Sequence, residues 1–111
     1  MTEQTDTPQI RWPAVLKLHG ADELTYLQDT ESWRRDPHLQ ATQLTAEDCL
    51  IDSTGRGFRI GTTGAFIASG RQFGLAEVLQ LVRRHAAQDG ACCIAKLDAP
   101  SIPEAIAMVQ D

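Results

Sequence analysis

Cysteine is the residue type in this chain most suited to metal ligation or nucleophilic chemistry, and two of the three cysteines, Cys92 and Cys93, are adjacent within the apolar segment 91–97. Successive side chains of a strand point to opposite faces, so adjacent cysteines in a strand cannot share one metal ion or form an unstrained bridge. The C-x-x-C spacing of zinc and redox sites is absent. We interpret the pair as packing residues; the alternatives are a reactive thiol or a metal ligand.

The histidines also lack a ligand spacing, since His19, His38 and His85 form neither an H-x-x-x-H nor an H-E-x-x-H pattern. We therefore predict no metal. His85 lies in a predicted helix, seven residues before Cys92. It is either a boundary residue that covers the edge of the core or the acid or base of a Cys–His pair.

The glycine-rich stretch at 53–64, STGRGFRIGTTG, is a candidate phosphate-binding loop. Such a loop leads into the N-terminus of a helix, where backbone N–H groups hold the phosphate. Here an apolar strand pattern follows the first glycines instead. We interpret them as hairpin glycines and predict no cofactor.

Arginines provide the one electrostatic feature of interest. The net charge of −5 argues against a nucleic-acid binder, because affinity for phosphate backbones comes from clustered Lys and Arg. Residues 53–97 nevertheless carry six basic and two acidic side chains. If the fold gathers Arg56, Arg59 and Arg71, their guanidinium groups would form a site for an anion. The alternative is that they are solvated or pair with the chain's own acids.

The elements that would position these residues begin near Ile10. Apolar and polar residues alternate over 11–18 and again over 23–28, which predicts two strands joined as an antiparallel hairpin, with Pro13 near the start of the first. Residues 29–36 predict a helix of about two turns that Trp33 anchors. Three short apolar runs within 48–69, separated by glycine turns, predict a meander.

The C-terminal part is predicted to be helix, strand, helix. Residues 74–90 have apolar side chains at helical spacing, 91–97 are apolar on both faces like a central strand, and Ser101 with Glu104 forms a capping box for a last helix. The order ββαββ(β)αβα predicts one small α+β domain over 10–111, after a disordered tail at 1–9. We expect a mostly antiparallel sheet of five to six strands with the two C-terminal helices packed on it, one available to each face.

The compartment follows from what the chain lacks. No apolar stretch approaches the ~20 residues of a membrane span, and the first residues do not resemble a signal peptide. An odd number of irregularly spaced cysteines suits a reducing environment. We predict a cytoplasmic protein with no membrane contact.

Four segments read together resemble a known group: IRWPAVLK, DELTYL, LIDSTG and LVRRHAAQDGACCIAKLDAPSIPEAIAMV. Over Ile10 to Val109 the chain resembles a small family of proteobacterial single-domain proteins of unknown function. The resemblance implies a bacterial, stand-alone cytosolic domain of about this length, and it supplies no activity or site residues.

Two classes of function follow. The favoured one is a non-catalytic binding or regulatory module that acts through a protein–protein surface, with an unknown protein partner or as a homodimer. The alternative is a small anionic-ligand-binding domain or enzyme that uses Arg56, Arg59 and Arg71, with His85 as an acid or base. A deep cavity that holds two or more of these arginines would favour the second class, and their dispersal over separate faces would oppose it.

Overall fold

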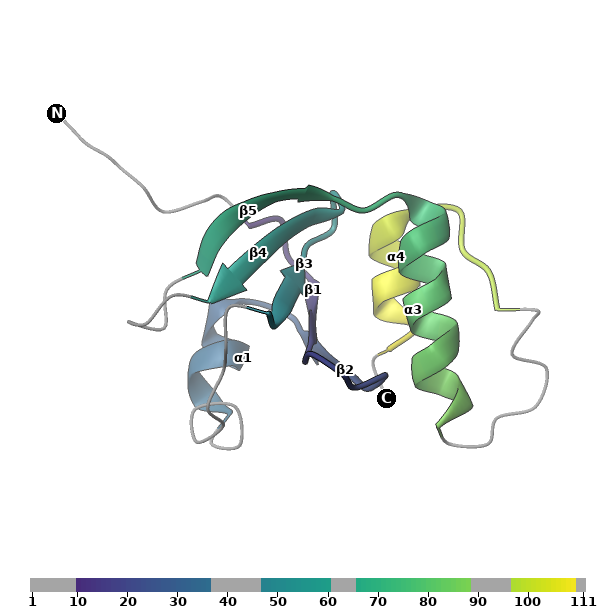
Figure 1. The fold of residues 1–111 in the computed structure, drawn as a ribbon, viewed down its shortest axis with the longest axis horizontal. Helices are drawn as coiled ribbons and strands as arrows, with labels where there is room; N and C mark the ends of the chain where they lie inside the picture. Colours follow the sequence, from purple (N-terminus) through teal and green to yellow (C-terminus); the bar gives the residue numbers. More distant parts are fainter. Residues whose placement is uncertain (1–9, 37–46, 61–65, 89–96, 110–111) are drawn as a thin grey trace, which may run out of the picture.

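The computed structural model describes residues 10–36, 47–60, 66–88 and 97–109. In chain order its elements are β1 (Ala14–Lys17), β2 (Leu24–Leu27), α1 (Thr30–Arg35), β3 (Cys49–Ile51), β4 (Arg56–Ile60), β5 (Phe66–Gln72), α3 (Leu75–Ala87) and α4 (Ile102–Ala107). Figure 1 shows the sheet with α3 and α4 beside it. The predicted α+β class is confirmed.

All neighbouring strands of the five-stranded sheet, in the order β2-β1-β3-β4-β5, are antiparallel. β1 and β2 form the predicted hairpin, with Ala14 opposite Leu27 and Lys17 opposite Leu24. Pro13, which has no N–H to give to a ladder, comes directly before β1. β3, β4 and β5 form the predicted meander, and β5 lies at the edge of the sheet.

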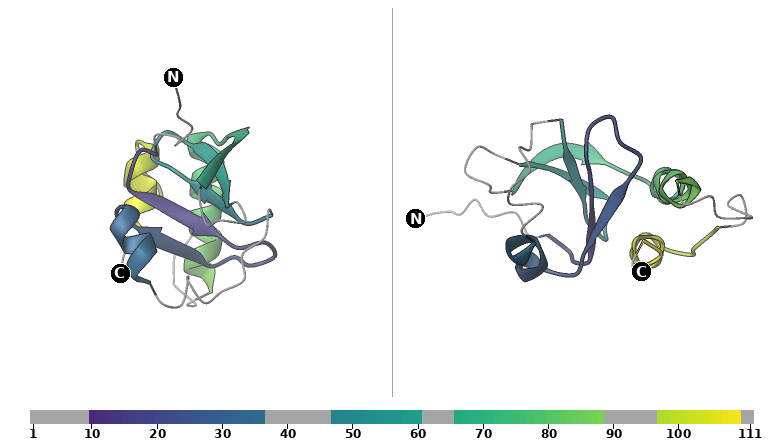
Figure 2. Two further views of the ribbon diagram at one scale, coloured as in Figure 1. Left: turned by 90° about the vertical axis from the view of Figure 1, so that its left-hand side faces the viewer. Right: turned by 90° about the horizontal axis from the view of Figure 1, so that it is seen from below.

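The sheet separates two apolar clusters, as strand alternation requires. On one face, Val15 and Ile51 pack with residues of α3 and α4. On the other, Leu16 and Phe58 pack with Trp33 of α1. Figure 2 shows the three layers, with α1 on one side of the sheet and the α3–α4 pair on the other.

The expectation that each C-terminal helix covers its own face is wrong. Val78 and Val82 of α3 belong to the same cluster as Ala105 and Ile106 of α4. α4 has only six residues and packs against α3, so the two helices form one layer. The opposite face is closed by Trp33, whose ring centre lies 4.9 Å from that of Phe66.

Local signals explain the helix ends. Asp29 accepts a hydrogen bond from the Ser32 N–H at the start of α1, and Ser101 accepts one from the Glu104 N–H at the start of α4. In α3, the Gly74 N–H donates to Oε1 of Glu77 at 3.0 Å. Side chains therefore cap the N-termini of both short helices, and at α4 the cap is the predicted Ser101.

A buried carboxylate organises the turn between β3 and β4. Asp52 is fully buried and accepts hydrogen bonds from the N–H groups of Arg11, Thr54 and Arg56 and from the Thr54 hydroxyl, at 2.7 to 3.0 Å. Gly55 follows with φ +85°, and its carbonyl accepts the Phe73 N–H at 2.7 Å. The turn thus ties β3 and β4 to the connection between β5 and α3.

Several predictions fall outside the described residues. These are the tail at 1–9, His38, and most of the 91–97 strand, with Cys92 and Cys93. Among the helices that the structure does describe, none has the length and apolar character to cross a membrane.

Candidate functional site

A cavity of about 300 Å³ opens on the part of the sheet that α3 and α4 do not cover. Its walls come from three places in the chain: the β1–β2 turn, the start of β3, and the β4–β5 pair. The lining residues are His19, Glu47, Asp48, Cys49, Phe58, Arg59, Ser69 and Arg71. Strands that are distant in sequence therefore build one concave surface.

Strand alternation places Arg59 on the helix-facing side. Its neighbours Phe58 and Ile60 belong to the α1-side cluster, so the side chain between them points the other way. Arg59 is opposite Ile67 of β5. The same face of β5 carries Ser69 and Arg71, so Arg59 and Arg71 both line the cavity.

Of the three arginines predicted as an anion site, two converge and one does not. Arg59 and Arg71 line the cavity, and Arg56 is not among its lining residues. The ladder shifts between Arg56 and Phe58, where Arg56 is opposite Gln72 but Phe58 is opposite Ala68. Strand alternation by itself puts Arg56 on the same face as Phe58 and Ile60, opposite to Arg59. The Arg56 guanidinium carbon lies 5.5 Å from the centre of the Phe58 ring.

The guanidinium groups of Arg59 and Arg71 make no ion pair or hydrogen bond with any residue that the structure describes. Arg71 lies over the Phe73 ring at 4.7 Å, a cation–π contact that leaves its N–H groups available. Arg83, by contrast, donates two hydrogen bonds to the Leu97 carbonyl at 2.7 and 3.0 Å. The guanidinium N–H groups of Arg59 and Arg71 are therefore available to donate hydrogen bonds to a bound molecule.

The acidic residues of the cavity lie at its other end, around His19. Nε2 of His19 is 2.9 Å from Oε2 of Glu47, and its backbone N–H donates to Oδ1 of Asp48 at 2.8 Å. The nearby Lys17 ammonium donates to the Ala21 carbonyl at 2.6 Å. The cavity is thus polarised, with two guanidinium groups on the β4–β5 side and two carboxylates on the side of the β1–β2 turn.

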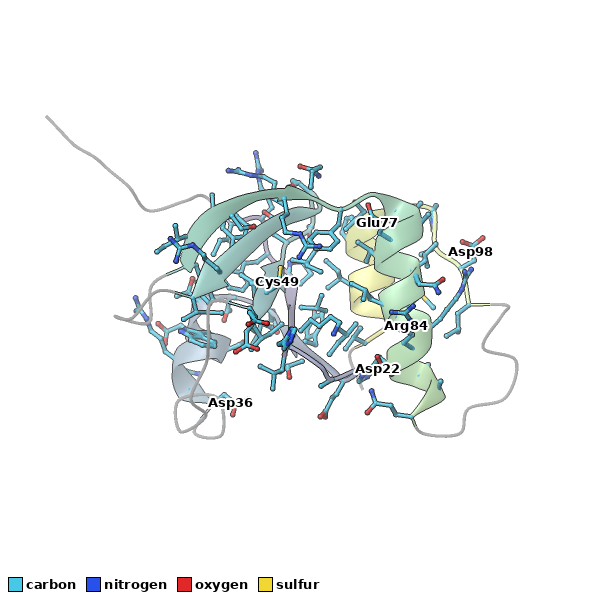
Figure 3. All side chains as sticks on the ribbon, in the orientation of Figure 1. Asp22, Asp36, Cys49, Glu77, Arg84 and Asp98 are labelled. Carbon is cyan, nitrogen blue, oxygen red and sulfur yellow. The ribbon has the colours of Figure 1, made fainter. Side chains whose placement is uncertain are left out.

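Cys49 lies between these two ends, on the side of the sheet that faces the helices (Figure 3). Burial raises the pKa of the Cys49 thiol, against the opposing effects of Arg71, a backbone hydrogen bond at Phe58, and Lys17. A raised pKa keeps the thiol protonated at neutral pH. Cys49 therefore does not neutralise the arginines as a thiolate would.

A second cavity of about 190 Å³ continues the first. It shares His19, Glu47, Cys49 and Arg71 with the first cavity and extends to Phe73 and Leu81, at the base of α3. An apolar hollow of about 330 Å³ on α3 adjoins it, also at Phe73 and Leu81. A molecule held by the arginines would have apolar surface within reach.

His85 does not belong to this site. Its Nδ1 accepts the Leu24 N–H at 3.0 Å, which ties the end of α3 to β2. It is not among the residues that line the cavity. Cys92, its partner in the second of the two interpretations above, lies outside the described residues. Among the described residues, no group of three or more His, Cys, Asp and Glu side chains could hold a metal ion.

Sequence reasoning gave no role to His19, Cys49 or Ser69. Cys49 and Ser69 are on strands whose faces the alternation predicts, but their proximity depends on the order of the strands in the sheet. His19 is in a turn, where no periodicity applies. No local pattern marks these three as neighbours.

The family comparison and the structure comparison give the same result. No curated protein matches the chain. A solved structure does, the NMR structure of a protein from Shewanella amazonensis: it is 30% identical, has a TM-score of 0.72, and the match covers 92% of this chain and 89% of that one.

The model of one protein family, DUF4144, described as "protein structure with unknown function", matches residues 12–109. This confirms the resemblance to a small family of unknown function, and the Shewanella structure comes from a proteobacterium. Since the match spans nearly all of the fold described above, the chain belongs to the DUF4144 family.

Proposed function

We propose that this domain is a non-catalytic binding module that uses the anion site of the alternative hypothesis, so that its partner places an anionic group between Arg59 and Arg71. One observation carries the proposal: Arg59 and Arg71 line a single cavity of about 300 Å³, and their guanidinium groups make no ion pair with the described residues. Arginine presents a rigid fork of donors that matches a carboxylate or phosphate.

The fold supports this role by holding the two arginines on adjacent strands. A strand fixes the direction in which its side chains leave the backbone, so each guanidinium loses less freedom on binding than it would from a loop. The Phe73 ring further restricts Arg71. Preorganised donors of this kind favour binding of a group of fixed shape.

The state of Cys49 favours binding over catalysis. It is the most nucleophilic group in the cavity, and its raised pKa disfavours the reactive thiolate at neutral pH. His85, the acid or base of the alternative hypothesis, accepts a hydrogen bond from the Leu24 N–H of β2. The cavity thus has the donors for an anion without an activated nucleophile beside them.

Nuclear magnetic resonance titration of the ¹⁵N-labelled chain tests the proposal, with inorganic phosphate and glutarate as separate probes. We expect the Nε–H signals of Arg59 and Arg71 to shift with saturation. Because a hydrogen bond to a charged group contributes about 1.5–3 kcal/mol, Arg59→Gln or Arg71→Gln should weaken binding about tenfold or more.

Arg84→Gln is the matched control, since Arg84 is an exposed arginine on α3 outside the cavity. Equal weakening by all three substitutions would mean that the probes sense net charge alone, which would refute a site at Arg59 and Arg71. Circular dichroism of each variant verifies that the fold is retained.

A further inference from the structure

The outer edge of β5 lies next to the cavity, which Ser69 and Arg71 of this strand line. β5 has seven residues, more than any other strand described, and those from Ile67 to Gln72 are exposed. β5 is the last strand of the sheet, and no described residue pairs with its outer side. Folded proteins commonly protect such an edge with Lys or another charged residue, with Pro, or with a β-bulge; β5 has no Lys or Pro, and its charged residue and its register shift both lie beyond Ser69.

We propose that β5 accepts an extended acidic segment of a partner protein as an added antiparallel or parallel strand, with an acidic side chain of that segment held by Arg71 and Arg59. The inference rests on the proposed function, because it uses the same two arginines. It adds the class of partner and the mode of docking, in which backbone hydrogen bonds supply affinity and side chains supply specificity.

The distances permit both contacts at once. Neighbouring strands lie about 4.8 Å apart, so an added strand would be about 5 Å from β5 and about 10 Å from β4. Arg71 is on β5, directly beside the added strand. Arg59 is on β4, one strand further, and an extended arginine together with a glutamate side chain spans that gap.

The bulge limits where pairing can occur. Gly70 has φ +81°, and the β4–β5 register shifts next to it. A bulge interrupts a ladder and twists the strand. Regular pairing is therefore expected along Phe66 to Ser69, with Arg71 reached just past the bulge.

Charge decides between an acidic partner and a second copy of this chain. β4 and β5 together carry Arg56, Arg59 and Arg71 and no acidic residue. Pairing of two β5 strands would bring Arg59 and Arg71 of both copies, four arginines, to one face of the joined sheet, and like charges across a ladder are destabilising. An acidic strand meets the same edge with complementary charge.

The test uses the full ¹⁵N-labelled chain and an acetylated, amidated hexapeptide of alternating valine and glutamate as the probe. Valine favours the extended form, and glutamate supplies the carboxylates. We expect amide hydrogen exchange of Ile67 to Ser69 to slow at least tenfold at saturation. The same peptide with glutamine in place of each glutamate should bind at least tenfold more weakly.

Ile67 is the position for a matched pair of variants, because its side chain is exposed and lies opposite Arg59. Ile67→Glu supplies a competing carboxylate beside Arg59 and repels the peptide, so it should weaken binding at least tenfold. The glutamine of Ile67→Gln has the size of glutamate without its charge, so this variant should weaken peptide binding much less.

The outcomes separate this inference from the proposed function. If phosphate binds at Arg59 and Arg71 but the peptide leaves β5 exchange unchanged, strand addition is refuted and the anion site stands. Equal protection by the glutamate and glutamine peptides would refute an acidic partner. Slow exchange of the β5 amides in the free chain, or a dimer by sedimentation equilibrium that forms through β5, would show that another segment or a second copy occupies the edge.

Discussion

The helix-facing side of the sheet divides into a half that α3 and α4 cover and a half that they leave open. In the covered half, Val15 and Ile51 are buried against the helices. In the open half, β4 and β5 present Arg59, Ile67 and Arg71, all exposed. The two halves belong to one sheet and follow the same alternation, and they differ in what lies above them.

The difference shows where fold and function separate in a small domain. The covered half supplies apolar burial, the main favourable term in folding. On the open half, the opposite face of β4 and β5 is already closed by Trp33 and Phe66, so the exposed side chains are not required for the core. Side chains there can contact a partner, because the core does not need them.

The largest expected effect compares one isoleucine from each half. Ile51 is 1% exposed and Ile67 is 39% exposed, and both are on strands. Ile51→Ala should lower the free energy of unfolding by about 3 kcal/mol, since it leaves a cavity in the core. Ile67→Ala should change it by no more than about 0.5 kcal/mol. Urea denaturation measures both, and equal losses would mean that the open half is also part of the core.

The second prediction concerns the turn that joins the halves. A Cβ at Gly55 would overlap the Phe73 carbonyl oxygen, and φ is +85°. We expect Gly55→Ala to lower the free energy of unfolding by at least about 2 kcal/mol, from left-handed strain plus displacement of β5.

Gly20→Ala is its control. Gly20 has φ +79° but no atom within 4 Å of an added Cβ. Gly20→Ala should lower the free energy of unfolding only by the left-handed strain, about 1–2 kcal/mol. If thermal or urea denaturation gives the two alanine variants the same stability, the close approach of Phe73 to the turn contributes nothing.

The third prediction weakens the same turn without a steric clash. Asp52→Asn retains the size of a fully buried side chain but replaces one acceptor oxygen with an NH₂ group that faces backbone donors. We expect a loss of about 2 kcal/mol in the free energy of unfolding. The exposed Asp22→Asn should leave stability within about 0.5 kcal/mol of the original. A neutral Asp52→Asn would show that the turn does not depend on the carboxylate.

The smallest expected effect is on the alkylation rate of Cys49, which lies at the boundary between the two halves. Because its pKa is raised, mainly by burial, alkylation by iodoacetamide should increase with pH and reach its midpoint above the ordinary thiol value. Arg71 lowers that pKa, so Arg71→Gln should raise it further and slow alkylation at pH 8.

This measurement needs a background with Cys92→Ser and Cys93→Ser, so that one thiol reacts. Arg84→Gln serves again as the control for net charge. A rate for Arg71→Gln that equals or exceeds that of the parent would contradict a position of Arg71 beside the thiol.

Much of the fold could be predicted from periodicity and turn residues. The β1–β2 hairpin, the Trp33 anchor of α1, the three-stranded meander and the apolar stripe of α3 all follow from local patterns. The shared layer of α3 and α4 did not, since an apolar stripe predicts that a helix is buried but not on which face of the sheet.

The candidate site was predictable in part. Charge counting drew attention to Arg56, Arg59 and Arg71, and alternation gives the face of Arg59. Alternation also puts Arg56, three residues before Arg59 on the same strand, on the opposite face and outside the cavity. No sequence pattern places Cys49 beside Arg71, because their strands meet only through β4.

By itself, the sequence determined the elements that the structure describes, the apolar face of most of them, and the excess of arginine in the central segment. These properties arise from neighbours along the chain, where residue spacing and turn chemistry act directly. The tertiary structure alone decided which half of the sheet the helices cover, and therefore which arginines stay open and which thiol they adjoin. Those relations depend on contacts between segments far apart in the chain, which local patterns do not specify.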